Sequence, residues 1–238
     1  MIPLKDDVPT ETFPIDTIVI IGINVFIFIY QLSLGIGGNK LVYSYGIMPY
    51  EIIRLKDIAP TIPHPIYATI FTSMFLHGGF LHLAGNMLYL WIFGNNVEDA
   101  VGHFKFLIFY FTCGIAAGFL YIILNPNSKV PLIGASGAIS GILGAYILLY
   151  PKARVHTLII FIFFIQIIKI PAIVIIGFWI IIQILNYLSS LGAVGSGGIA
   201  WLAHIGGFFA GLFLIRYFKK SHIKFGGGGS SKKNHFLR

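Results

Sequence analysis

Six long apolar segments restrict this chain to folds that place helices in a lipid bilayer. Each segment approaches the ~20 mostly apolar residues that a helix needs to cross the hydrocarbon core. The predicted spans are 15–34, 79–96, 103–124, 136–151, 171–188 and 201–218. Only 10% of the residues are charged, against about 25% in soluble domains, which is too few to cover a surface that faces water. The sequence therefore predicts an all-α membrane protein, a bundle of six transmembrane helices.

The segments between the spans set the domain organisation. We expect a cytoplasmic N-terminal segment over 1–14, a membrane domain over 15–218 and a basic cytoplasmic tail over 219–238. Acidic residues precede the first apolar run, which does not fit a cleavable signal peptide. The mixed, proline-rich stretch 35–75 is typical of a loop in or on the membrane interface. The glycine-rich stretches 192–198 and 226–231 have the composition of flexible connections.

The apolar segment 155–170 has two interpretations. Lys169 and Pro171 interrupt it, which favours a segment folded against the bundle ahead of the fifth span. A continuous bent helix is the alternative.

The distribution of basic residues predicts the orientation of the bundle. With both termini inside, 12 of the 16 Lys and Arg residues lie in inner segments, seven of them in the C-terminal stretch. Inner segments of membrane proteins carry such an excess, so both termini should be cytoplasmic. A basic cluster directly after a span is typical of an anchor at the anionic leaflet, and we expect a lipid bilayer rather than nucleic acid as its partner.

Two polar residues in the apolar spans suggest chemistry. Ser136 begins the fourth span, within Gly-Ala-Ser-Gly, and His204 lies near the outer end of the sixth. Serine is a poor nucleophile unless a base lies within hydrogen-bond reach, and His204 could accept its proton and return it to a leaving amine. Taken alone, Gly-Ala-Ser-Gly in a membrane helix is more often a packing motif. The two residues together, at matching depth, favour a catalytic pair.

The surrounding residues are consistent with a pair rather than a triad. The eight acidic residues all lie in the N-terminal segment, in the first loop or at helix ends, so a Ser-His dyad is the economical interpretation. Gly137 and Gly141 form one small-residue face, and Gly207 and Gly211 form another. Such spacing lets two helix backbones approach closely, which would bring Ser136 towards His204.

His82 and Asn86 are four residues apart in the second span and therefore share one helix face. An imidazole and an amide aimed at one point can donate hydrogen bonds to a developing oxyanion. A metal site of histidines is the alternative, but no His-Glu-x-x-His pattern is present and no acidic ligand lies at that depth. We therefore expect no metal.

These motifs carry a resemblance to a known family. The stretches HGGFLHLAGN, GASG and AHIGGFFAG occur in this order on separate predicted spans. Together they resemble the rhomboid family of intramembrane serine proteases, and the similarity covers roughly residues 71–211. It implies a six-helix rhomboid-like core with a water-filled site open to the non-cytoplasmic side.

The resemblance also implies roles for the residues. Ser136 would be the nucleophile, His204 the general base, and His82 and Asn86 would line the oxyanion hole. The partners would be transmembrane protein substrates, which enter between the second and fifth spans and are cut without metal or cofactor.

The chain departs from the family pattern at two places. Ala68 and Thr69 stand where members often carry a Trp-Arg pair, and Ser140 stands where some members place a tyrosine that stacks on the catalytic histidine. Two other functions stay open. One is a rhomboid-like protein that binds membrane clients without cutting them, and the other is a transporter, although no carboxylates lie deep in the spans and no internal repeat is visible.

Overall fold

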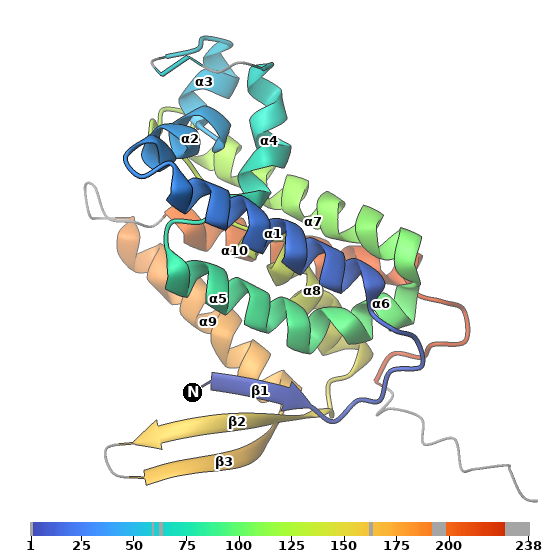
Figure 1. The fold of residues 1–238 in the computed structure, drawn as a ribbon. Helices are drawn as coiled ribbons and strands as arrows, with labels where there is room; N and C mark the ends of the chain where they lie inside the picture. Colours follow the sequence, from blue (N-terminus) through green and yellow to red (C-terminus); the bar gives the residue numbers. More distant parts are fainter. Residues whose placement is uncertain (1, 59, 62–63, 162–163, 192–198, 227–238) are drawn as a thin grey trace, which may run out of the picture.

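The computed structural model describes all residues except 1, 59, 62–63, 162–163, 192–198 and 227–238, so the loop 192–198 and most of the tail lie outside the described residues. The fold is a helical bundle with a small sheet at one end and a short-helix region, which holds α2 and α3, at the other (Figure 1). The helices are α1 (Ile15–Ser33), α2 (Gly37–Tyr45), α3 (Pro49–Arg54), α4 (Thr69–Thr72), α5 (Phe80–Tyr89), α6 (Asn95–Val101), α7 (His103–Leu124), α8 (Ser136–Leu149), α9 (Ala172–Ser190) and α10 (Ile199–Phe218). The strands are β1 (Ile2–Asp6), β2 (Arg154–Phe161) and β3 (Phe164–Pro171).

The described helices support a multi-pass integral membrane protein. Four of them, α1, α7, α9 and α10, are long and apolar enough to cross a bilayer. The helical run Phe80–Val101 joins α5 to α6 through one π-helical turn. Together with Ile66–Phe75, from which it is bent by 79°, this run is long and apolar enough to count as a fifth span. α8 has 14 residues, which at ~1.5 Å per residue reach only roughly 21 Å, less than the ~30 Å hydrocarbon core. The predicted number of six spans therefore stays a prediction.

α8 forms the centre of the bundle, packed on α7 and α10. It is apolar all round, and 11 of its residues are buried, as expected for a helix with no solvent-facing side. Aromatic side chains of the neighbouring elements fill the space around it, among them the fully buried Phe93 and Phe109, and Tyr146 of α8 itself is also fully buried. Phe93 packs edge-on against Tyr146 with ring centroids 4.9 Å apart.

Glycines allow α8 and α10 to touch backbone to backbone. A methyl group on Gly207 would overlap the carbonyl oxygen of Gly137, and one on Gly211 would overlap that of Gly141. A methyl group on Gly144 would overlap the carbonyl oxygen of Phe208. The close approach predicted from the small-residue faces is therefore present, and it holds the two helices in a fixed register.

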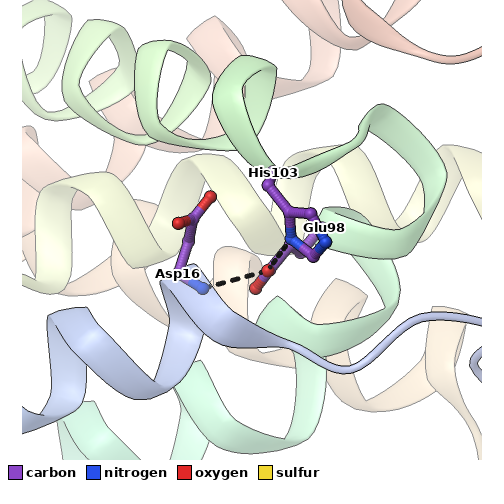
Figure 2. A group of neighbouring side chains, drawn as sticks. All are labelled: Asp16, Glu98 and His103. Carbon is purple, nitrogen blue, oxygen red and sulfur yellow. Dashed lines mark hydrogen bonds and ion pairs between the residues drawn. The ribbon is translucent and has the colours of Figure 1, made fainter.

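An acidic pair on α6 fastens the start of α1. The buried carboxylate of Glu98 accepts hydrogen bonds from the backbone N–H groups of Asp16 and Thr17, at 3.0 and 2.9 Å, and from the Thr17 hydroxyl. His103 contacts the same carboxylate at 2.6 Å (Figure 2). Asp99 accepts the backbone N–H groups of residues 11 and 12. Because the first N–H groups of a helix have no partner inside it, Glu98 acts as an N-terminal cap supplied by another helix.

The described residues of the segment 155–170 lie in two strands, β2 and β3, so the bent-helix alternative is wrong. β2 pairs with β3, and the N-terminal strand β1 adds to the other edge of β2, which gives an antiparallel sheet in the order β1-β2-β3. β-Branched residues dominate the segment and favour strands, and the backbone N–H of Ala172, after Pro171, bonds to the Ala153 carbonyl. Val155 and Thr157 are buried, whereas Ile160, Ile165 and Ile167 are more than half exposed.

Asp6 anchors β1 to the bundle. Its carboxylate accepts a hydrogen bond from the Tyr146 hydroxyl on α8, and the neighbouring Asp7 accepts the backbone N–H of Arg154 at 2.8 Å. Burial raises the pKa of Asp6 to about 6 from its usual 3.8, against the opposing effect of the Tyr146 hydrogen bond. The folded protein therefore holds this proton more tightly than the unfolded chain does.

Replacing Glu98 by glutamine should destabilise the protein by about 2–4 kcal/mol, because the new amide group would face N–H donors in a buried site. The measurement is thermal unfolding in detergent micelles. Asp99→Asn, at a more exposed position, should cost about 1 kcal/mol or less. Equal effects of the two substitutions would contradict the assignment of Glu98 as the buried cap.

The docking of β1 should weaken as the pH rises. A carboxyl group whose pKa is raised on folding stabilises the fold below its unfolded pKa, and this contribution is lost as the pH passes through the folded value. Proteolytic release of the N-terminal segment should therefore increase between about pH 4 and pH 6. Asp6→Asn should remove this dependence and Asp7→Asn should keep it; a wild type with a flat profile would refute the role of Asp6.

Gly211→Ala should destabilise the bundle by about 1–3 kcal/mol or more, because the added methyl group overlaps the backbone of α8. Gly177→Ala on α9 is the matched control, since nothing lies within 4 Å of a methyl group there. That control should be neutral or slightly stabilising because alanine favours helix. Unfolding midpoints in detergent test both, and a neutral Gly211→Ala would exclude the close helix contact.

Candidate active site

Ser136 is the first residue of α8, directly after a tight loop. Gly134 in this loop has a φ of +121°, a conformation that favours glycine, and its N–H bonds to the Ser73 carbonyl at 2.9 Å. A methyl group on Gly134 would lie 2.9 Å from Nε2 of His82. The loop therefore passes directly against the His82 ring and presents the Ser136 side chain beside it.

His204 lies on α10 and reaches Ser136 across the glycine contact described above. Its Nε2 is 2.9 Å from Oγ of Ser136, within ordinary hydrogen-bond distance. Both side chains are partly buried. The structure thus brings together the serine and the histidine that the sequence pairs across 68 residues.

The hydrogen bonds of His204 determine which ring nitrogen carries the proton. Nδ1 lies 2.8 Å from Oε1 of Gln183 on α9. Because an amide oxygen only accepts, Nδ1 is the donor, and Nε2 of the neutral ring is left as an acceptor. Ser136 can then donate its hydroxyl proton to Nε2, which is the direction that activates a serine.

His82 has the opposite arrangement. Its Nδ1 accepts the backbone N–H of Gly78 at 3.3 Å, so Nε2 carries the proton and faces the loop at Gly134. Asn86, one turn further along α5, lies with its amide nitrogen 2.9 Å from Nε2 of His77. That bond uses one of the two N–H groups of Asn86. Two side-chain donors therefore lie on the face of α5 that borders Ser136.

A cavity of about 240 Å³ joins these groups. Its lining includes Ser136, His204, His82 and Asn86, which come from α8, α10 and α5. Leu81, Gly85 and Tyr89 of α5 and Trp179 of α9 complete opposite walls. The four residues predicted from the sequence thus border one space.

Two features of the site did not follow from the sequence. Gln183 was not predicted, and only its polarity within an apolar helix could have drawn attention to it. Trp179, one turn before it, lies beside the His204 ring with centroids 5.7 Å apart and planes at 38°. Ser140 stands at the position where some family members place a tyrosine, and it donates a hydrogen bond to the Ser136 carbonyl at 2.6 Å. His204 therefore has an aromatic neighbour on α9 and a second on its own helix, Trp201, which lies edge-on with ring centroids 6.4 Å apart.

Ala68 and Thr69, which stand where family members often carry a Trp-Arg pair, lie in a short helical turn. Ala68 ends a short 3-10 turn, and Thr69 is buried with its hydroxyl bonded to the Ile66 carbonyl at 2.6 Å. The loop after them is tied to α1, because Gln31 bonds both the N–H and the carbonyl of His77, at 3.2 and 2.8 Å.

Among the described residues, Asp16, Glu98 and His103 form one group close enough to hold a metal ion (Figure 2). Both carboxylate oxygens of Glu98 already accept hydrogen bonds from the start of α1 and from His103. The group also lies 12 residues along the helix from Asn86, roughly 18 Å away. Its bonding is that of a helix cap, separate from the cavity at Ser136.

Comparison with known proteins gives a consistent result. The model of the rhomboid domain matches residues 65–221. Rhomboid protein 1 of yeast mitochondria (Saccharomyces cerevisiae) is 31% identical over 159 residues, which cover 64% of this chain and 42% of that protein. The rhomboid protease GluP of Bacillus subtilis is 30% identical over 118 residues, 50% of this chain and 21% of that protein.

A third relative, the human presenilin-associated rhomboid-like protein of mitochondria, is 31% identical over 84 residues, 34% of this chain and 22% of that protein. The chain thus spans less than half the length of each of these relatives. The matched domain covers well over half of the chain and includes every residue of the cavity wall named above. The chain belongs to the rhomboid family.

Proposed function

We propose that this protein is an intramembrane serine protease, which hydrolyses peptide bonds in or near transmembrane segments of other proteins. The observation that carries the proposal is the 2.9 Å contact between Ser136 Oγ and His204 Nε2, inside a cavity of a rhomboid-family chain. The hydrogen bond at Nδ1 supports it, because it leaves Nε2 free to accept the serine proton.

In the proposed reaction, Ser136 Oγ attacks the scissile carbonyl carbon while His204 Nε2 takes the hydroxyl proton. The carbonyl oxygen becomes an oxyanion, which His82 Nε2–H, Asn86 and the Ser136 backbone N–H would stabilise. His204 then gives its proton to the leaving amine, and the C–N bond breaks to leave an acyl-enzyme ester. Water, deprotonated by His204, hydrolyses the ester and restores Ser136.

Access to the site would run between α5 and α9. Leu81 on α5 is 84% exposed and also borders the cavity, so this wall faces outward as well as inward. A substrate helix would unwind locally beside these two helices and present an extended backbone to Ser136. Water for the second half of the reaction would occupy the same cavity, whose polar groups provide hydrogen-bond partners.

The orientation in the membrane is part of the proposal. The excess of basic residues in inner segments supports cytoplasmic termini, with 1–14 and 219–238 inside and 15–218 as the membrane domain. Ser136 then lies towards the non-cytoplasmic side. The pairing of β1 with β2 is consistent with this orientation, because it requires the N-terminal segment and the connection after α8 to lie on the same side.

A reporter fused after Arg238 tests this orientation. A cytoplasmic terminus should give an active cytoplasmic reporter and an inactive reporter of the type that needs export. Single cysteines in a Cys113→Ser background give an independent check, since one at Lys129 should react with an impermeant thiol reagent from outside and one at Lys152 should not. The opposite pattern would overturn the proposed orientation.

The activity is tested with a fluorophosphonate probe and a model transmembrane substrate in liposomes. Wild type should label and cut, whereas Ser136→Ala and His204→Ala should lose about 10⁴-fold or more of the rate, because the pair acts as a unit. Ser189→Ala and His222→Ala, outside the cavity, are the matched controls and should keep full activity.

A well-folded wild type that neither labels nor cuts would refute the protease. Binding of the same transmembrane segment by this inactive protein would then identify a client-binding member of the family.

A further inference from the structure

The histidine of a serine–histidine pair needs an acceptor at Nδ1, because a proton on Nε2 would prevent it from acting as the base. Among the described residues this acceptor is Gln183, whose amide oxygen lies 2.8 Å from Nδ1 of His204. We propose that Gln183 is the positioning residue of His204, which it holds in the tautomer and ring orientation that leave Nε2 open to Ser136. The inference rests on the proposed function of the pair.

The orientation of the Gln183 amide is itself determined. Its nitrogen lies 3.4 Å from the Trp179 carbonyl, one turn earlier on α9, and can donate to it. The flipped amide would turn its oxygen towards that carbonyl and its N–H groups towards Nδ1. His204 would then carry its proton on Nε2 and could only donate to Ser136. One of the two orientations therefore satisfies both neighbours and gives a basic Nε2.

Burial makes this arrangement costly to lose. Gln183 is 4% exposed, and the other buried residues on the described α9 are Ala172, Ile176 and Ile180, which form an apolar stripe. A buried amide without a partner would destabilise the protein. The bond to His204, together with the longer one to the Trp179 carbonyl, gives the amide the partners that its burial requires.

Two contacts from α9 and one from Trp201 on α10, whose ring lies edge-on at 6.4 Å, hold the ring. Gln183 holds the edge at Nδ1, and the Trp179 ring lies beside the imidazole at 5.7 Å. Ser140 on α8 provides no ring contact and bonds the Ser136 carbonyl instead. The contacts to the His204 ring thus come from α9, which also forms one wall of the cavity, and from Trp201 of α10, and not from Ser140 on α8.

A neutral acceptor also suits the membrane. A carboxylate at the same place would bring a charge into a span, where ionised groups are costly. The amide oxygen fixes the tautomer without that charge.

The test compares two substitutions of similar size. Gln183→Met fills the same volume but removes the acceptor, whereas Gln183→Glu keeps an acceptor oxygen in either protonation state. If Gln183 positions His204, kcat for a transmembrane substrate should fall about 10–100-fold in Gln183→Met with KM nearly unchanged. Gln183→Glu should stay within a few-fold of wild type. Asn186→Ala, an amide on the same helix outside the cavity lining, is the control and should match wild type.

A role in packing alone predicts the reverse order. Methionine would then be tolerated in the apolar stripe and glutamate would be the damaging residue. An active Gln183→Met, or a Gln183→Glu more impaired than Gln183→Met despite equal thermal stability, would overturn the proposal.

The tautomer gives a readout that does not depend on activity. Nitrogen-15 chemical shifts of labelled histidine, assigned by the loss of the signal in His204→Ala, should show the proton of His204 on Nδ1 in wild type. Gln183→Met should shift it towards a mixture. An active wild type with the proton on Nε2 would overturn the inference about Gln183 alone. An inactive wild type with the proton on Nδ1 would refute the protease and leave Gln183 as the residue that orients this ring.

Discussion

The contact between the backbones of α8 and α10 is the constraint on which the site depends. Ser136 and His204 project from two different helices, and the length of their side chains allows a hydrogen bond only if the helix axes lie unusually close. Glycines at 137, 141 and 144 on one helix and at 207 and 211 on the other remove the side chains that would hold the axes apart. In a bilayer no hydrophobic effect drives helices together, so such close packing also provides much of the association energy. The same residues therefore stabilise the bundle and set the distance between the two reactive groups.

The candidate site at Ser136 is built from neutral groups, as expected in a lipid bilayer, where ionised groups are costly. Each histidine has its tautomer fixed by a neutral partner: an amide oxygen for His204 and a backbone N–H for His82. The carboxylates lie outside the cavity: Glu51 is on α3 at the short-helix end, where it accepts the Ile58 N–H, and Glu98 and Asp6 are near the sheet end of the bundle. There each is surrounded by donors at a helix start or by a tyrosine hydroxyl. The carboxylates thus lie outside the cavity. Inside the cavity, the direction of neutral hydrogen bonds fixes the tautomers of the two histidines.

The sequence predicts most of the helices because hydropathy and length are local properties. The predicted 15–34 and 103–124 match α1 and α7 closely, and Ser136 begins α8 as expected. Ser136, His204, His82 and Asn86 could be named because they occur in recognisable motifs, and the structure places all four around one cavity, although their chemical roles stay predictions. Gln183 carries no such motif, and its contact depends on how α9 rotates against α10. The pairing of β1 with β2 joins residues about 150 positions apart, and neither short segment carries a sequence pattern that predicts its partner.

The long helical run from Phe80 to Val101 connects the two ends of the molecule and explains their different character. Its last turns carry Glu98 and Asp99, which hold the start of α1 through several hydrogen bonds to backbone groups. Its first turns carry Leu81, His82 and Asn86 at the cavity, where Leu81 and Phe80 are largely exposed. Both ends of this run are tied to α1, because Gln31 bonds the backbone of His77, directly before the run, and Glu98 bonds the start of α1. His82 and Asn86 lie on this run, whereas Ser136 and His204 belong to the glycine contact between α8 and α10, so the proposed oxyanion donors and the serine–histidine distance are set by separate parts of the fold.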